Sequence, residues 1–239
     1  MVSIVQNFIC SKQERLEVIE RNSVKLGNVF SEVEFFVNYN SDVNFDSVKS
    51  YYQKNIPKMN LYNDLTKDWA LVTLALMQEV KTPYVMYICE DMEVNCHKDE
   101  MWSALNEFMD SDYDLFFLSK IRKYLQQEYI NGYTPYNDIR SPGYKLLNHG
   151  YFYLGKHAPH KRVPVDAIFK TEWIIERLKE FLVNGDNCTH DIPFRKKHLP
   201  NFWEGYYDFN NGMKRFGEFK CYIPEKELLR EFNDVKDKA

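Results

Sequence analysis

Residues 82–95 read TPYVMYICEDMEVN, in which six apolar or aromatic residues run directly into Glu90, Asp91 and Glu93. The short apolar run predicts a buried strand. In open α/β sheets, ligands bind at the carboxyl ends of the strands, where the loops converge. We therefore expect the three carboxylates to lie at the ligand-binding edge of a sheet.

The acidic cluster predicts a divalent metal site. Neighbouring carboxylates repel one another in a partly buried place unless a positive charge compensates them. Oxygen ligands alone suit Mg²⁺ or Mn²⁺. In an extended chain, Asp91 and Glu93 would lie on one side and Glu90 on the other. The competing interpretation is that these acids only solubilise a loop.

The flanking sequence predicts the α/β class. Apolar segments typical of buried strands alternate with segments of helical periodicity, which indicates a mostly parallel central sheet covered by helices on both faces. The expected strands are residues 2–10, 32–41, 83–89, 112–120 and 150–155. The first expected helix begins near Lys12, and four others cover residues 45–54, 68–80, 98–110 and 172–184. A last amphipathic helix is expected to open at Pro224, with Leu228, Leu229 and Phe232 facing inward.

Composition restricts the possible partners and compartment. The chain of 239 residues suits one domain, and its net charge of −4 gives no overall basic field for nucleic acid or an anionic membrane. Its five cysteines form no Cys-x-x-Cys pair, which favours a reducing setting. No basic leader and no apolar stretch of about 18 residues is present. We therefore expect a cytoplasmic protein without a transmembrane segment.

At this level the sequence resembles the GT-A fold glycosyltransferases, particularly the family 2-like ones. The resemblance rests on the N-terminal strand VSIV with its capped helix, on the helix that leads into VKTPYV, and on the acidic cluster, which is similar to an Asp-x-Asp motif. It implies one domain over residues 1–239, with a nucleotide-sugar-binding half at 1–119 and an acceptor-binding and catalytic half at 120–239. In that family the acidic cluster binds a metal, here Mn²⁺ or Mg²⁺, that holds the donor diphosphate.

Two registers fit the family's acidic motif. The register Cys89, Glu90, Asp91 loses the first carboxylate, whereas Asp91, Met92, Glu93 keeps both but changes one residue type. Asp91 is retained in either register. The resemblance therefore implies a metal held by Asp91 and Glu93, with Glu90 beside the substrate.

The resemblance also implies that the first half binds the donor. Asn38 and Asn40 end the second expected strand, where amide groups suit a nucleobase or ribose. Ser11 and Arg15 stand at the first helix N-terminus, which favours a phosphate or ribose edge. Asp68 begins the helix before the acidic strand, where it either contacts the base or only caps the helix.

The second half is expected to supply the catalytic base. Its place in the family corresponds best to Asp191, which follows the helix EWIIERLKEFLVN, and Glu204 is the competing candidate. The nearby run RKKH contains Arg195 and Lys197, which either face the leaving diphosphate or form a solvated surface.

The function expected from these features is transfer of a sugar from a nucleotide-diphosphate donor to a glycan acceptor, with inversion and metal assistance. The tyrosine-rich segment 124–153 offers flat apolar faces that suit the acceptor's sugar rings. A sugar-phosphate nucleotidyltransferase is the second enzyme hypothesis, although the Gly-rich phosphate loop expected there is missing from VSIVQNFICSKQER. A non-catalytic glycan-binding module of the same fold is the third.

Overall fold

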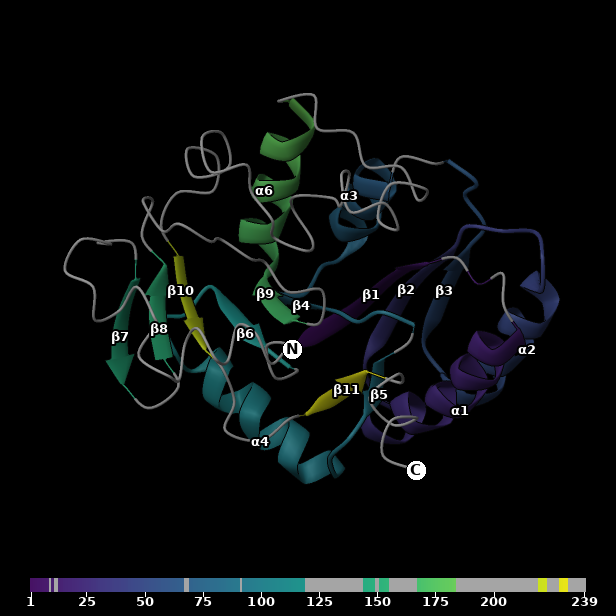
Figure 1. Ribbon diagram of the computed structural model, residues 1–239, viewed down its shortest axis with the longest axis horizontal. Helices are drawn as coiled ribbons and strands as arrows, with labels where there is room; N and C mark the ends of the chain where they lie inside the picture. Colours follow the sequence, from purple (N-terminus) through teal and green to yellow (C-terminus); the bar gives the residue numbers. More distant parts are fainter. Residues whose placement is uncertain are drawn as a thin grey trace.

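A computed structural model gives the fold of the chain (Figure 1). It describes residues 1–8, 10, 13–66, 69–90, 92–118, 144–148, 151–154, 167–183, 219–222 and 228–231. Within these ranges, a large sheet forms the centre of the molecule and helices lie on both of its faces. The α/β class and the helices on both faces are therefore as predicted.

The central sheet is mostly parallel. Its nine described strands follow in the order β3 (Met59–Tyr62), β2 (Glu34–Tyr39), β1 (Val2–Phe8), β4 (Tyr84–Tyr87), β9 (Ala167–Lys170), β6 (Leu115–Phe117), β10 (Phe219–Tyr222), β8 (Tyr151–Leu154) and β7 (Tyr144–Asn148). Every antiparallel pair in it contains β9 or β8. The other seven strands consequently share one direction, and β3, β2, β1 and β4 form a continuous parallel block.

Two layers of helices bury this sheet. Helices α1 (Gln13–Val29), α2 (Phe45–Asn55) and α4 (Lys98–Met109) lie on one side, whereas α3 (Trp69–Glu79) and α6 (Thr171–Val183) lie on the other (Figure 1). Strand β1 is covered from both sides, and all seven of its residues are buried. Burial on both faces accounts for the apolar residues of this strand, and its three polar residues, Ser3, Gln6 and Asn7, are buried with them.

The last helix, predicted to open at Pro224, is wrong at residues 229–231, whereas Pro224 and Phe232 lie outside the described residues. Residues Leu229–Glu231 form a short strand, β11, that pairs antiparallel with β5 (Met92–Val94). The backbone N–H groups of Leu228 and Leu229 both donate to the carbonyl of Leu118, at 3.0 and 2.8 Å. Both leucines are buried, as predicted. Their backbone groups, however, pair with distant parts of the chain, and this pairing outweighs the helical periodicity of the local sequence.

The short strands β3, β5, β7, β9 and β10 were not predicted from the sequence. Each has only three to five residues, so its own sequence carries little periodicity. Strand β9 lies between β4 and β6 and runs opposite to both, which makes it the element that joins the two halves of the sheet.

Helices α1 and α2 approach each other closely at Gly27. A Cβ atom on Gly27 would lie 2.1 Å from the backbone carbonyl oxygen of Asn55, the last residue of α2. Because backbone must then shift, Gly27→Ala is expected to lower the free energy of unfolding by about 1–3 kcal/mol. Without this clash, alanine would stabilise the helix by up to about 1 kcal/mol, so the sign of the change, measured by chemical denaturation, reports the contact.

Val24→Ala is the matched control, since Val24 lies on the same helix with 44% of its surface exposed. This variant should unfold at nearly the same denaturant concentration as the parent chain. A Gly27→Ala variant as stable as the control would show that α1 and α2 are farther apart than described.

Candidate functional site

Buried asparagines gather where β1 and β2 end. The Asn38 amide nitrogen donates to Asn7 Oδ1 at 3.0 Å and to the Asp64 carbonyl at 3.1 Å, and Asn38 Oδ1 accepts the Asp64 backbone N–H at 2.8 Å. Asn7 in turn donates to Thr73 Oγ1 of α3 at 3.0 Å. The chain of bonds joins the two strands to α3 and to the loop after β3.

Asn40 holds the same loop from a second point. Its amide nitrogen donates to the carbonyls of Asp64 and Thr66, both at 2.7 Å, and its own backbone N–H donates to the Phe8 carbonyl at 2.9 Å. The predicted contact of Asn38 and Asn40 with a nucleobase or ribose stays a prediction. In the structure, both amides position residues 63–66.

Asp64 is the charged group that this arrangement brings to the edge of the sheet, and the sequence analysis missed it. Hydrogen bonds from the Thr66 side chain and from the Thr66 N–H, the latter 2.8 Å long, lower the pKa of the exposed Asp64 carboxyl. An aspartate two residues before a threonine is typical of a turn in which the carboxylate binds the following backbone. That pattern, in NDLT, was the available signal.

The acidic segment after β4 is a tight turn. The backbone N–H of Met92 donates to the Cys89 carbonyl at 3.2 Å, a bond that spans Glu90 and Asp91 in the chain. Residues 89–92 are called the acidic turn from here on. The buried Glu90 carboxylate accepts a hydrogen bond from Arg15, which lies in the first turn of α1. The structure thus brings together two residues that were predicted to contact the substrate.

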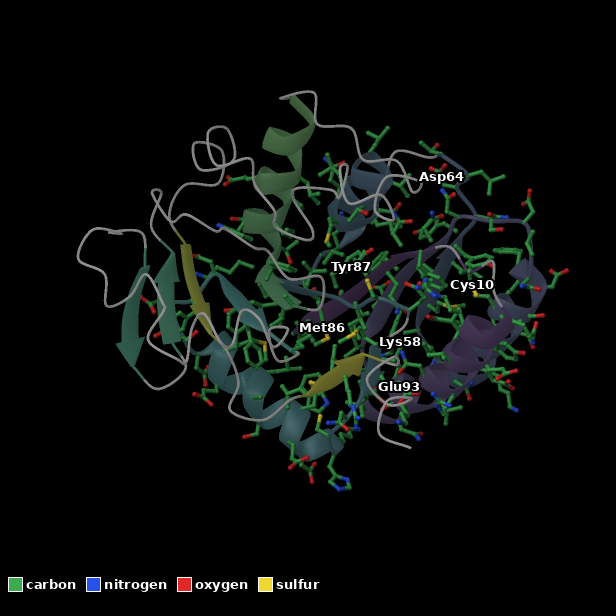
Figure 2. All side chains as sticks on the ribbon, viewed as in Figure 1. Cys10, Lys58, Asp64, Met86, Tyr87 and Glu93 are labelled. Atoms are coloured by element: carbon green, nitrogen blue, oxygen red, sulfur yellow. The ribbon has the colours of Figure 1, made fainter. Side chains whose placement is uncertain are left out.

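Glu93 lies farther along α1 than Glu90 does. Its Oε1 accepts hydrogen bonds from the Arg21 guanidinium, with Nε at 2.6 Å, and its Oε2 lies 3.4 Å from Lys25 Nζ. Arg21 and Lys25 follow Arg15 by six and ten residues, which corresponds to about 9–15 Å along a helix. Figure 2 accordingly shows Glu93 near β5 and β11, and Asp64 near α3.

The remaining predicted site residues lie outside the described part of the chain. They are Ser11, Asp68, Asp91, Asp191, Arg195, Lys197 and Glu204. Among the residues that the structure describes, no group of three or more His, Cys, Asp or Glu side chains is placed to hold a metal ion. None of the described helices is long and apolar enough to cross a membrane.

Comparison with known proteins gives a result at the level of structure. No protein-family profile matches the sequence, and no curated protein matches it. S. aureus TarS 1–349 in complex with UDP-GlcNAc superposes with a TM-score of 0.55 at 9% identity, over 95% of this chain and 57% of that chain. Mannosyltransferase PcManGT from Pyrobaculum calidifontis, in complex with GDP-Man and Mn²⁺, superposes with a TM-score of 0.53 at 13% identity, over 95% of this chain and 55% of that chain. This is the GT-A fold.

The GT-A fold is shared by other enzymes that handle nucleotides. The 4-diphosphocytidyl-2C-methyl-D-erythritolsynthase from Anaerococcus prevotii superposes with a TM-score of 0.51 at 12% identity, over 99% of this chain and 93% of that chain. At such identities the likeness shows the fold alone. The chain also spans little more than half the length of the two glycosyltransferases, so its activity has to be inferred from its own residues.

The two possible registers of the acidic motif are separated by Glu93→Gln. If Glu93 anchors β5 to α1, the variant should lose about 1–2 kcal/mol of unfolding free energy, because the Arg21 and Lys25 charges lose their partner. Its nucleotide binding should respond to Mn²⁺ as in the parent chain. Chemical denaturation and calorimetric titration measure the two quantities.

Glu32→Gln provides the control, since Glu32 pairs with Lys58 on the surface and 81% of its side chain is exposed. Its stability should not change measurably. An unchanged stability for Glu93→Gln, together with loss of the Mn²⁺ response, would instead assign Glu93 to the metal.

Proposed function

We propose that this protein is a glycosyltransferase that moves a sugar from a nucleotide-diphosphate donor to a glycan acceptor. The observation that carries the proposal is the place of the acidic turn within the GT-A fold. The turn follows β4 directly and is bonded to the N-terminal turn of α1 through Arg15 and Glu90. Ligands of open α/β sheets bind at this end of the strands.

The acids at positions 90, 91 and 93 are of a type that suits a hard divalent cation, but we do not assign them the same task. Glu90 and Glu93 already have cationic partners on α1, so we assign the metal, Mn²⁺ or Mg²⁺, to Asp91. When bound, the metal would offset the negative charge that develops on the leaving diphosphate. Arg195 and Lys197 are proposed to add positive charge to the same phosphate groups.

The donor's nucleoside is assigned to the ends of β1 and β2 and the loop after β3. Asn38 and Asn40 contribute by holding residues 63–66, and the exposed Asp64 carboxylate supplies an acceptor for N–H or O–H groups of the nucleoside. Ser11 and Asp68 adjoin this region in sequence and are proposed to line it.

The acceptor hydroxyl must lose a proton as it attacks the donor sugar. A carboxylate within hydrogen-bond reach performs this task as general base, which typically contributes 10²–10⁴-fold to the rate. We propose Asp191 for the role, and Glu204 is the alternative within the second half of the chain. With the base and the leaving diphosphate on opposite sides of the sugar, the transfer inverts its configuration.

A nucleotidyltransferase is the second candidate function. It is favoured by one specific observation, since the chain covers 93% of the Anaerococcus prevotii synthase but only 57% of TarS 1–349. The absence of a Gly-rich phosphate loop after the first strand weighs against it. The two reactions differ in their products, because only nucleotidyl transfer from a nucleoside triphosphate to a sugar phosphate releases pyrophosphate.

A thermal-shift panel of nucleotides and nucleotide sugars, each with and without Mn²⁺, tests the proposal. A nucleotide sugar at 100 times its dissociation constant is expected to stabilise the chain by about 2.7 kcal/mol. The shift should be larger with Mn²⁺ than without it. Stabilisation by CTP with pyrophosphate release from a sugar phosphate would favour the nucleotidyltransferase, and no shift with any nucleotide would favour the glycan-binding module.

Asp91→Asn tests the assignment of the metal. The variant should keep its thermal stability without ligands but lose the Mn²⁺-dependent part of donor binding and the transfer activity, because a neutral amide is a poor ligand for a hard cation. Asp110→Asn, at the exposed C-terminal end of α4, is the control and should behave like the parent chain. Full activity of Asp91→Asn would remove Asp91 from the site.

A further inference from the structure

A buried polar chain links helix α2 to the end of strand β4. The Tyr52 hydroxyl of α2 donates to Gln6 Oε1 at 2.8 Å, and Gln6 Nε2 donates to the Ile88 carbonyl at 3.2 Å. Gln6 is completely buried in β1, and Tyr52 is 2% exposed. Burying these groups costs free energy unless each finds a partner, so both bonds are needed to keep Gln6 inside the core.

The Gln6 side chain acts where the backbone pairing of β1 with β4 stops. The register of the two strands ends at Val5 opposite Tyr87, and the last backbone bond runs from the Ile88 N–H to the Val5 carbonyl at 3.3 Å. The next carbonyl, that of Ile88, is bound by the side chain of Gln6. The side-chain amide of Gln6 therefore adds one more hydrogen bond between β1 and the segment that follows β4, just before the acidic turn.

The far end of the acidic turn is held in the same way. Asn22 of α1, which is 2% exposed, donates through Nδ2 to the Met92 carbonyl at 2.6 Å. Two buried amide side chains thus bind the two carbonyls that flank the turn, from β1 on one side and from α1 on the other. Between them, Glu90 is bonded to Arg15 and the Met92 N–H to Cys89.

The charge state of Tyr52 suits this role. Burial, and to a lesser extent the negative charge of Glu90, raises the pKa of Tyr52, while the hydrogen bond with Gln6 lowers it. With the net shift upward, the hydroxyl keeps its proton near neutral pH and remains a donor to Gln6.

We propose that Tyr52 and Gln6 are positioning residues that fix the acidic turn and thereby set the metal-dependent affinity for the nucleotide-sugar donor. This inference rests on the proposed function, since it assigns the metal to Asp91 of the same turn. Neither residue is proposed to contact the donor. Both act through the Ile88 carbonyl, as a preorganised support for a binding group.

Tyr52→Phe tests the inference with the loss of a single hydroxyl. Amide hydrogen exchange under native conditions should become faster in the peptide that covers residues 88–95, by roughly 2- to 10-fold, the range for loss of one buried hydrogen bond. The Mn²⁺-dependent part of the affinity for a nucleotide sugar, measured by calorimetry, should fall by a similar factor. Affinity for the same nucleotide sugar without metal should stay unchanged.

Tyr84→Phe is the matched control, because the Tyr84 hydroxyl also donates to a backbone carbonyl, that of Met109 at 2.9 Å, but at the opposite end of β4. Any general destabilisation should appear in both variants, whereas the local exchange and the change in metal dependence should appear only in Tyr52→Phe. Gln6→Met breaks the same link from its other side and should reproduce the result.

The two parts of the experiment fail independently. Equal exchange at residues 88–95 in Tyr52→Phe and Tyr84→Phe would overturn the positioning role, whatever the enzyme does. Faster exchange with an unchanged response to Mn²⁺ would also overturn it, since the turn would then move without consequence for the metal. Absence of nucleotide-sugar binding by the parent chain would remove the proposed function, and the exchange measurement would still decide whether Tyr52 and Gln6 hold the turn.

Discussion

The structure depends on the complete burial of strand β1. It is paired with β2 on one side and β4 on the other, and helices cover both faces of the sheet at this point. A strand in that position can carry polar side chains only where each finds a partner inside the protein. Gln6 and Asn7 stand at its carboxyl end, and successive side chains of a strand point to opposite faces. Their partners accordingly lie in different layers, Tyr52 in α2 for Gln6 and Thr73 in α3 for Asn7.

These two residues organise the whole carboxyl edge. Asn7 is bonded to Asn38, which fixes the loop carrying Asp64, whereas Gln6 holds the Ile88 carbonyl before the acidic turn. The nucleoside side and the phosphate side of the proposed site are thus set by adjacent positions of one strand.

Ion pairs with α1 account for two of the three carboxylates that follow the hydrophobic strand β4. After β4 the chain turns and runs along α1, and cationic side chains of this helix pair with its acids. Arg15 forms an ion pair with Glu90, and Arg21 and Lys25 both form ion pairs with Glu93. Two of the three acids therefore fasten the returning chain to a helix. Asp91 is the acid to which we assign the metal.

The sequence by itself determined the α/β class, the strands β1, β2 and β4 of the parallel block and the helices of the first half, because apolar runs and helical periodicity are local signals. It also predicted a site at the acidic segment, because the carboxylates are close together in the sequence, and this site stays a prediction. Only the tertiary structure decided that Glu93 faces Arg21, that Leu229–Glu231 form a strand beside β5, and that Tyr52 reaches Gln6 from 46 residues away. These pairings join segments far apart in the chain, and no local pattern of residues specifies which buried polar group will meet which.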